Sequence, residues 1–63
     1  MSTQTESRHF LKPGDTVQHV GGGAGTVVEA FALYAVVRWD DGRQEEVDQL
    51  DPRVAVTERA SRE

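Results

Sequence analysis

Carboxylates are the residues of this sequence whose type and spacing first suggest chemistry. Asp40 and Asp41 are adjacent, and Glu45 and Glu46 form a second pair a few residues later. Paired carboxylates serve as general acid and base when a concave, partly dry site moves their pKa values apart. These pairs flank Gly42, so we expect them at a solvated hairpin, which offers no such site. Two interpretations remain: a charged face that keeps a sheet edge from aggregating, or an acidic surface for a basic partner.

Other catalytic and metal-binding patterns are missing from the sequence. The chain contains no cysteine, and His9 and His19 have no second ligand at the spacing of a metal site. The hydroxyl nucleophiles Ser2, Ser7 and Ser61 lie in terminal segments, where no scaffold would hold a base beside them. We therefore expect no catalytic residue, no metal and no cofactor.

A run of glycines interrupts the first half of the chain at Gly21, Gly22, Gly23 and Gly25. Glycine-rich loops bind phosphates in nucleotide-binding proteins, but the P-loop motif ends in Gly-Lys-Ser/Thr and the dinucleotide motif opens a helix. Here Thr26 and a β-branched segment follow instead. We predict a tight, mobile loop between two strands, with contact to a partner as the alternative role.

Aromatic and β-branched residues dominate residues 26–32 and 33–39, which predicts two neighbouring strands. In the second strand the alternation groups Ala35, Val37 and Trp39, joined by Leu33, on one face. The opposite face is formed by Tyr34, Val36 and Arg38. In the first strand the alternation places Val27, Glu29 and Phe31 opposite Val28 and Ala30.

Both faces of these strands are largely apolar, whereas a small barrel buries only one face of each strand. The simpler interpretation makes Trp39 and Phe31 core residues; the functional one leaves outward apolar side chains for a partner. A symmetric pair of chains would bury Val28, Tyr34 and Val36. The candidate partner-binding residues combine this segment with the acidic hairpin: Phe31, Tyr34, Val36, Trp39, Asp40, Asp41, Glu45 and Glu46.

The net charge of −4 comes from one segment of the chain. Residues 40–51 contain six acidic side chains and only Arg43 as a base, a net charge of −5. Residues 1–39 balance, and residues 52–63 carry +1. Because neutralisation of phosphates by Lys and Arg supplies most non-specific nucleic-acid affinity, we expect the acidic face not to bind a duplex.

Turn signals divide the chain into five short strands and predict an all-β fold. Pro13-Gly14-Asp15 predicts a turn before a strand that begins at Thr16. Asp40-Asp41-Gly42 predicts a hairpin in which residues 44–47 return antiparallel to residues 36–39. Residues 48–52 predict a single 3₁₀-like turn before a last strand at 53–56. We thus expect one small barrel over residues 11–56, a disordered arm at 1–10 and a flexible tail at 57–63.

The length of 63 residues allows a single domain with a small core. Self-association is therefore an expected way to gain stability. No basic and apolar leader or membrane-spanning stretch is visible, and the lack of cysteine marks no oxidising compartment, so we expect a soluble, cytoplasmic protein.

The pattern over residues 11–56 resembles the small SH3-like or Tudor-like modules of the KOW and CarD kind. The resemblance rests on Pro13-Gly14-Asp15, Val17, His19, Gly25, Val27, Tyr34, Val36, Trp39-Asp40-Asp41-Gly42, Val47 and Leu50. It implies a five-stranded SH3-like barrel. In those families such a barrel binds RNA polymerase, the ribosome or nucleic acid, so the resemblance implies a fold more strongly than a partner.

A fainter resemblance links the chain to the plasmid-borne type II dihydrofolate reductases, whose SH3-like barrels assemble as tetramers around one pore. It rests on Gly14-Asp15-x-Val17, Gly25-x-Val27-Val28 and Tyr34-Ala35-Val36. The Val-Gln-Ile-Tyr active-site motif of that family would fall where this chain has Gln44-Glu45-Glu46-Val47. The residues that carry substrate and cofactor are therefore missing.

The sequence thus predicts a non-catalytic binding module, foremost a protein-interaction adaptor tied to transcription or a mobile element. Its expected partner is another protein or a second copy of the chain. A nucleic-acid-binding module of the KOW kind is the alternative, and a reductase of the type II kind is the remote third.

Overall fold

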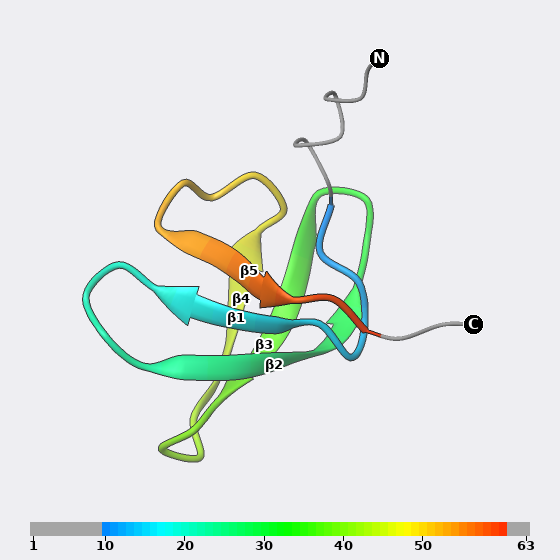
Figure 1. Ribbon diagram of the computed structural model, residues 1–63. Helices are drawn as coiled ribbons and strands as arrows, with labels where there is room; N and C mark the ends of the chain where they lie inside the picture. Colours follow the sequence, from blue (N-terminus) through cyan, green and yellow to red (C-terminus); the bar gives the residue numbers. More distant parts are fainter. Residues whose placement is uncertain (1–9, 61–63) are drawn as a thin grey trace.

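The computed structural model describes residues 10–60 as five antiparallel strands in one sheet (Figure 1). The strands are β1 (Thr16–His19), β2 (Ala24–Ala30), β3 (Tyr34–Trp39), β4 (Gln44–Asp48) and β5 (Val54–Glu58). Their spatial order is β4-β3-β2-β1-β5, so each strand pairs with its successor except that β5 returns to β1. The predicted all-β fold is confirmed. Over residues 10–60 we find no helix with the length and apolar character needed to cross a membrane.

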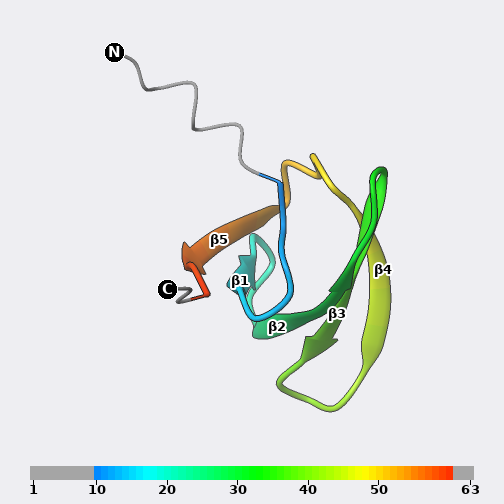
Figure 2. The ribbon, with the colours of Figure 1, turned by 90° about the vertical axis from the view of Figure 1, so that its right-hand side faces the viewer.

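The sheet is strongly curved and remains open. In Figure 2 it bends so that β5 and β1 lie on one side and β3 and β4 on the other. β4 and β5 are its two edges, and within residues 10–60 no strand pairing joins them. Closure into a barrel is therefore not confirmed.

The β3–β4 hairpin has the turn that its sequence predicts. The backbone N–H of Gly42 donates to Trp39 O at 2.9 Å, and the N–H of Trp39 donates to Arg43 O at 2.7 Å. Gly42 has a φ of 96°, a left-handed conformation that glycine adopts without a steric penalty. Across the hairpin Val37 pairs with Glu45, in the predicted antiparallel arrangement.

A bulge at Val28 shifts the alternation of side chains along β2. The pairing with β3 skips this residue, so two residues of β2 lie opposite one of β3. Val27 is fully buried and Ala30 packs against the core, whereas Glu29 is exposed. The predicted grouping of Val27, Glu29 and Phe31 on one face is therefore wrong beyond the bulge.

The connection between β2 and β3 is a turn that the sequence analysis treated as strand. Phe31, Ala32 and Leu33 form it, closed by a hydrogen bond from Phe31 N to Tyr34 O of 2.8 Å. Phe31 is 46% exposed and Leu33 is 81% exposed. The predicted core role of Phe31 and the predicted inward position of Leu33 are both wrong, because the turn carries these side chains beyond the end of the sheet.

The connection between β4 and β5 begins with the predicted single turn after Asp48 and adds a second turn before Val54 that the sequence did not predict. Asp51 N donates to Asp48 O, and Val54 N donates to Asp51 O, both at 3.1 Å. The carboxylate of Asp51 accepts hydrogen bonds from the backbone N–H and the guanidinium of Arg53. The side chain and then the backbone of Arg53 lower the pKa of Asp51. Asp51 thus belongs to both turns, and its carboxylate adds side-chain contacts to the second one.

The core lies inside the curve of the sheet and is small. It comprises six buried apolar side chains: Leu11, Val17, Val27, Ala35, Val37 and Trp39. The predicted inward face of β3, with Ala35, Val37 and Trp39, is confirmed. Each fully buried valine contributes about 1.5–3 kcal/mol, so a core of this size leaves little margin of stability.

The last strand is longer than predicted. β5 includes Thr57 and Glu58, which the sequence analysis assigned to a flexible tail. Thr57 donates from Oγ1 to Thr16 O at 3.3 Å, and Glu58 pairs with Thr16. The predicted disorder of residues 1–9 and flexibility of residues 61–63 lie outside the described residues.

A buried carboxylate joins the two ends of the described chain. Asp15 is 1% exposed, and its carboxylate accepts three hydrogen bonds from neighbouring segments. They come from the backbone N–H groups of Lys12 and Ala60, at 3.0 and 2.7 Å, and from the guanidinium of Arg59, at 3.1 Å. Arg59 also donates to Phe10 O at 3.3 Å. The segment before β1 is thereby fastened to the segment after β5.

We predict that Asp15→Ala lowers the free energy of unfolding by about 3 kcal/mol, because it leaves two part-buried N–H groups and a guanidinium without their acceptor. Urea denaturation followed by tryptophan fluorescence measures this loss. Asp48→Ala, which removes an exposed carboxylate, is the matched control and should change stability by less than about 0.5 kcal/mol. Equal losses in the two variants would contradict the role of Asp15.

Candidate functional site

The structure distributes the predicted binding residues over three places. Phe31 and Tyr34 flank the β2–β3 turn, at one end of β3. Val36 and Glu46 lie opposite each other on β3 and β4. At the other end of β3, where the β3–β4 hairpin begins, lie Trp39, Asp40, Asp41 and Glu45. The single aromatic and acidic region expected from the sequence is thus divided, and the third set lines a cavity.

Trp39 is fixed at the end of β3 by its contact with Gly25. Gly25 lies within β2 and pairs with Trp39, so its predicted place in the glycine loop is wrong. A Cβ atom at Gly25 would lie 2.8 Å from Cε3 of Trp39 and 2.7 Å from the carbonyl oxygen of Arg38. The indole therefore occupies the space that any other side chain would need.

Two polar contacts orient the indole further. Its Nε1–H donates to Oε1 of Glu45 at 3.0 Å, across the β3–β4 hairpin. The ring of His19, at the end of β1, packs edge-on against it with centroids 5.9 Å apart and planes at 83°. Trp39 is 7% exposed, so its core role is confirmed while one part of the ring borders the surface.

The glycine loop forms one wall beside Trp39. His19 N donates to Gly23 O at 3.0 Å, and Gly22 N donates to His19 O at 2.9 Å, which closes the loop over residues 20–23. The backbone N–H of Gly21 donates to Nδ1 of His19 at 2.9 Å. This bond occupies one ring nitrogen, so His19 orients the loop. The predicted position of the loop between two strands is confirmed for Gly21, Gly22 and Gly23, and its mobility stays a prediction.

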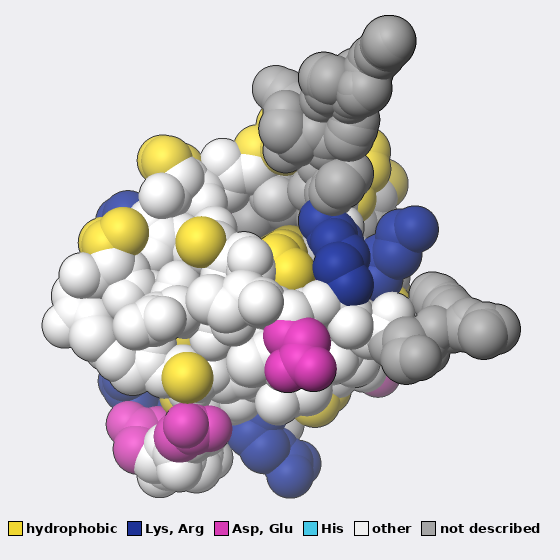
Figure 3. Space-filling model, in the orientation of Figure 1, with side chains coloured by type: hydrophobic (Ala, Val, Ile, Leu, Met, Phe, Trp, Pro, Cys, Tyr) yellow, Lys and Arg dark blue, Asp and Glu magenta, His cyan; other side chains and the backbone are white. Residues whose placement is uncertain are grey.

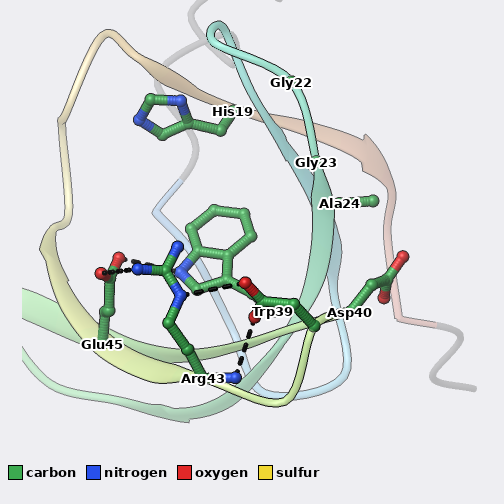
Figure 4. A pocket seen from close by; sticks show the side chains of 9 residues that line it. His19, Gly22, Gly23, Ala24, Trp39, Asp40, Arg43 and Glu45 are labelled. Carbon is green, nitrogen blue, oxygen red and sulfur yellow. Dashed lines mark hydrogen bonds and ion pairs between the residues drawn. The ribbon is translucent and has the colours of Figure 1, made fainter.

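A groove of about 390 Å³ lies between the glycine loop and the β3–β4 hairpin (Figure 4). It is lined by His19, Gly22, Gly23, Ala24, Trp39, Asp40, Asp41, Arg43 and Glu45. Figure 3 shows acidic side chains at the tip of this hairpin, at the lower left. The groove thus combines an aromatic wall, a backbone wall without large side chains and a rim of carboxylates.

Arg43 lies in the groove between two of these carboxylates. Its Nε is 3.0 Å from Oδ2 of Asp41, and its Nη1 is 3.5 Å from Oε2 of Glu45. The backbone N–H of Arg43 also donates to Oδ1 of Asp41 at 2.9 Å. This backbone hydrogen bond, followed by the one from the Arg43 side chain, lowers the pKa of Asp41. The carboxylate of Asp40 points away from this cluster, toward the side of Ala24 (Figure 4).

The opposite end of β3 carries an exposed apolar patch. The rings of Phe31 and Tyr34 stack with centroids 4.8 Å apart. The buried side chain of Gln49 joins this turn to the segment before β1. Its amide group donates to Phe31 O and to Leu11 O, and its carbonyl oxygen accepts from Leu11 N. Three apolar side chains next to these residues in the sequence are exposed, namely Phe10, Leu33 and Leu50.

Sequence reasoning missed three residues that shape these surfaces. His19 was interpreted as a structural or rim residue without a binding role, Arg43 was counted only as a charge, and Gln49 was placed only in the turn at residues 48–52. For Arg43 a signal existed, because Asp41-x-Arg43 across a glycine turn places a guanidinium beside a carboxylate. Within residues 10–60, no three His, Cys, Asp or Glu side chains are grouped as metal ligands.

Comparisons of the chain with protein-family models, with curated proteins and with solved structures gave no match. The function is therefore argued from the groove and its charges.

We predict that Gly25→Ala destabilises the fold by about 2 kcal/mol and shifts the emission of Trp39, because the new methyl group displaces the indole. Chemical denaturation and the fluorescence spectrum of the folded variant measure the two effects. In Gly22→Ala the new Cβ meets no atom, and only its φ of 108° is unfavourable, so the emission should not change. An unchanged emission in Gly25→Ala would contradict the assigned contact.

Proposed function

We propose that this protein is a non-catalytic binding module that holds a basic segment of a partner protein in the groove beside Trp39. The observation that carries the proposal is the combination of an indole, a glycine-walled groove and the carboxylates of Asp41 and Glu45. Protein interfaces favour an aromatic anchor inside a polar rim, and opposite charges guide the partner to it.

The size and walls of the groove support a side chain or short segment as ligand. Its volume of about 390 Å³ falls near the lower limit of small-ligand sites, which span roughly 300–1,000 Å³. Gly22 and Gly23 have no side chains, so the backbone of a bound segment can approach the loop closely.

The charge distribution supports a protein partner over nucleic acid. Asp40, Asp41 and Glu45 outnumber Arg43 among the lining residues, and phosphates would be repelled there. Among the described residues the groove also lacks the set of positioned acid, base and nucleophile that an enzyme needs, since its carboxylates are exposed and two of them, Asp41 and Glu45, are paired with Arg43. A cytoplasmic location belongs to this proposal and fits a chain without cysteine.

The outer face of β3 supports self-association less than the groove supports a different protein as partner. Val36 pairs with Glu29 on one side and Glu46 on the other, and Tyr34 is half-buried. A symmetric pair of chains that buried Val36 would bring four carboxylates together. We therefore favour a different protein over a second copy of the chain as the partner.

Titration with a short peptide rich in Lys and Arg, and without Trp or Tyr, tests the proposal. Trp39 is the single tryptophan, so its emission reports binding in the groove. Glu45→Gln keeps an acceptor for the indole N–H but removes the charge, and we expect it to weaken binding about tenfold, as for the loss of one charged contact. Asp48→Asn, on the same strand but not among the groove residues, should leave the affinity within twofold.

Two results would overturn the proposed function. One is an affinity for the basic peptide that is the same in Glu45→Gln as in the wild type. The other is tight binding of an oligonucleotide at physiological salt with a steep salt dependence, which would favour a nucleic-acid-binding module.

A further inference from the structure

The side chain of Arg43 lines the groove and pairs with two carboxylates that a basic ligand would use. Its guanidinium bridges Oδ2 of Asp41 and Oε2 of Glu45, two acceptors that belong to different parts of the hairpin. Figure 4 shows Arg43 beside Glu45, on the side of the groove where Trp39 lies. Resting on the proposed function, we propose that the groove binds the guanidinium group of an arginine in the partner, and that Arg43 is an internal competitor which this arginine displaces.

The two acceptor oxygens are held in place without the side chain of Arg43. Glu45 is oriented by the indole N–H of Trp39, which binds its other oxygen, Oε1. Asp41 is oriented by a backbone N–H, which binds its Oδ1. Both carboxylates therefore keep their positions when the guanidinium leaves, and an incoming group meets a pre-organised pair of acceptors.

The spacing of these acceptors favours a guanidinium over an ammonium group. Arg43 reaches Asp41 through Nε and Glu45 through Nη1, so two different nitrogen atoms of one planar group make the two contacts. A lysine presents its charge and all its donors on a single nitrogen atom. An arginine can thus satisfy both carboxylates at once, whereas a lysine makes one good contact.

The contacts of Arg43 are weak enough to be exchanged. Its side chain is 67% exposed, and those of Asp41 and Glu45 are 57% and 48% exposed. Exposed ion pairs contribute little to stability because water and salt screen them. As Arg43 is tethered next to the site, it nevertheless competes at a high effective concentration, so its removal should reveal a stronger site.

The matched pair of variants is Arg43→Ala and Arg53→Ala. Arg53 makes the same kind of contact two residues after an aspartate, Asp51, and its side chain is 66% exposed, but it does not line the groove. Both substitutions change the net charge equally. A difference between them therefore reports the groove and not the overall charge.

The experiment measures the affinity of each variant for two peptides that differ only in a central arginine or lysine, by the shift of the Trp39 indole N–H signal in NMR spectra. We expect Arg43→Ala to bind the arginine peptide about fivefold or more tightly than the wild type does, and the lysine peptide with a smaller gain. Arg53→Ala should bind both as the wild type does. Adding Glu45→Gln to Arg43→Ala should abolish the gain.

The outcomes separate this inference from the proposed function. Equal gains for both peptides, or no gain in Arg43→Ala while the wild type still binds basic peptides through Glu45, would overturn the arginine site and leave the proposed function standing. If neither the wild type nor Arg43→Ala binds any basic peptide, both are wrong.

Discussion

The close contact between Trp39 and Gly25 is the constraint on which the groove depends. The indole can lie at the end of β3 only because β2 has no side chain at this position, where a Cβ atom would be 2.8 Å from the ring. The same ring then holds Glu45 through its N–H and supports His19 at its edge. Three strands and the glycine loop thus receive their relative positions from one side chain, and the carboxylates of the groove are arranged around it.

Local patterns in the sequence were enough to predict most of the strands. The turn at Gly42 and the inward face of Ala35, Val37 and Trp39 follow from residue types and the two-residue repeat of a strand. The bulge at Val28 could not be predicted, because a bulge depends on pairing between strands and leaves no mark in the alternation of one strand. The exposed position of Phe31 was missed for a second reason, because residues 31–33 were predicted as strand and form a turn.

The candidate site was predicted only in part, for a related reason. Its charges are visible in the sequence, but the role of Arg43 depends on side-chain directions around the hairpin. Likewise, the buried side chains of Asp15 and Gln49 have hydrogen-bond partners 38 to 45 residues away in the sequence. No local sequence pattern predicts such contacts. In a domain with so small an apolar core, these polar contacts fasten the segments that flank the sheet.

The hydrogen bonds of Asp15 with Lys12, Arg59 and Ala60 hold both ends of the described chain on the side of the molecule away from the groove. Arg59 donates to the carbonyl of Phe10, so the two ends leave the sheet next to each other, while His19 and Trp39 lie at the far ends of β1 and β3 (Figure 1). Domains whose ends are adjacent tolerate insertion into a loop of another protein and circular permutation. The segments that continue from residues 10 and 60 therefore leave the sheet on the side away from the groove, an arrangement compatible with insertion of the sheet into a host protein.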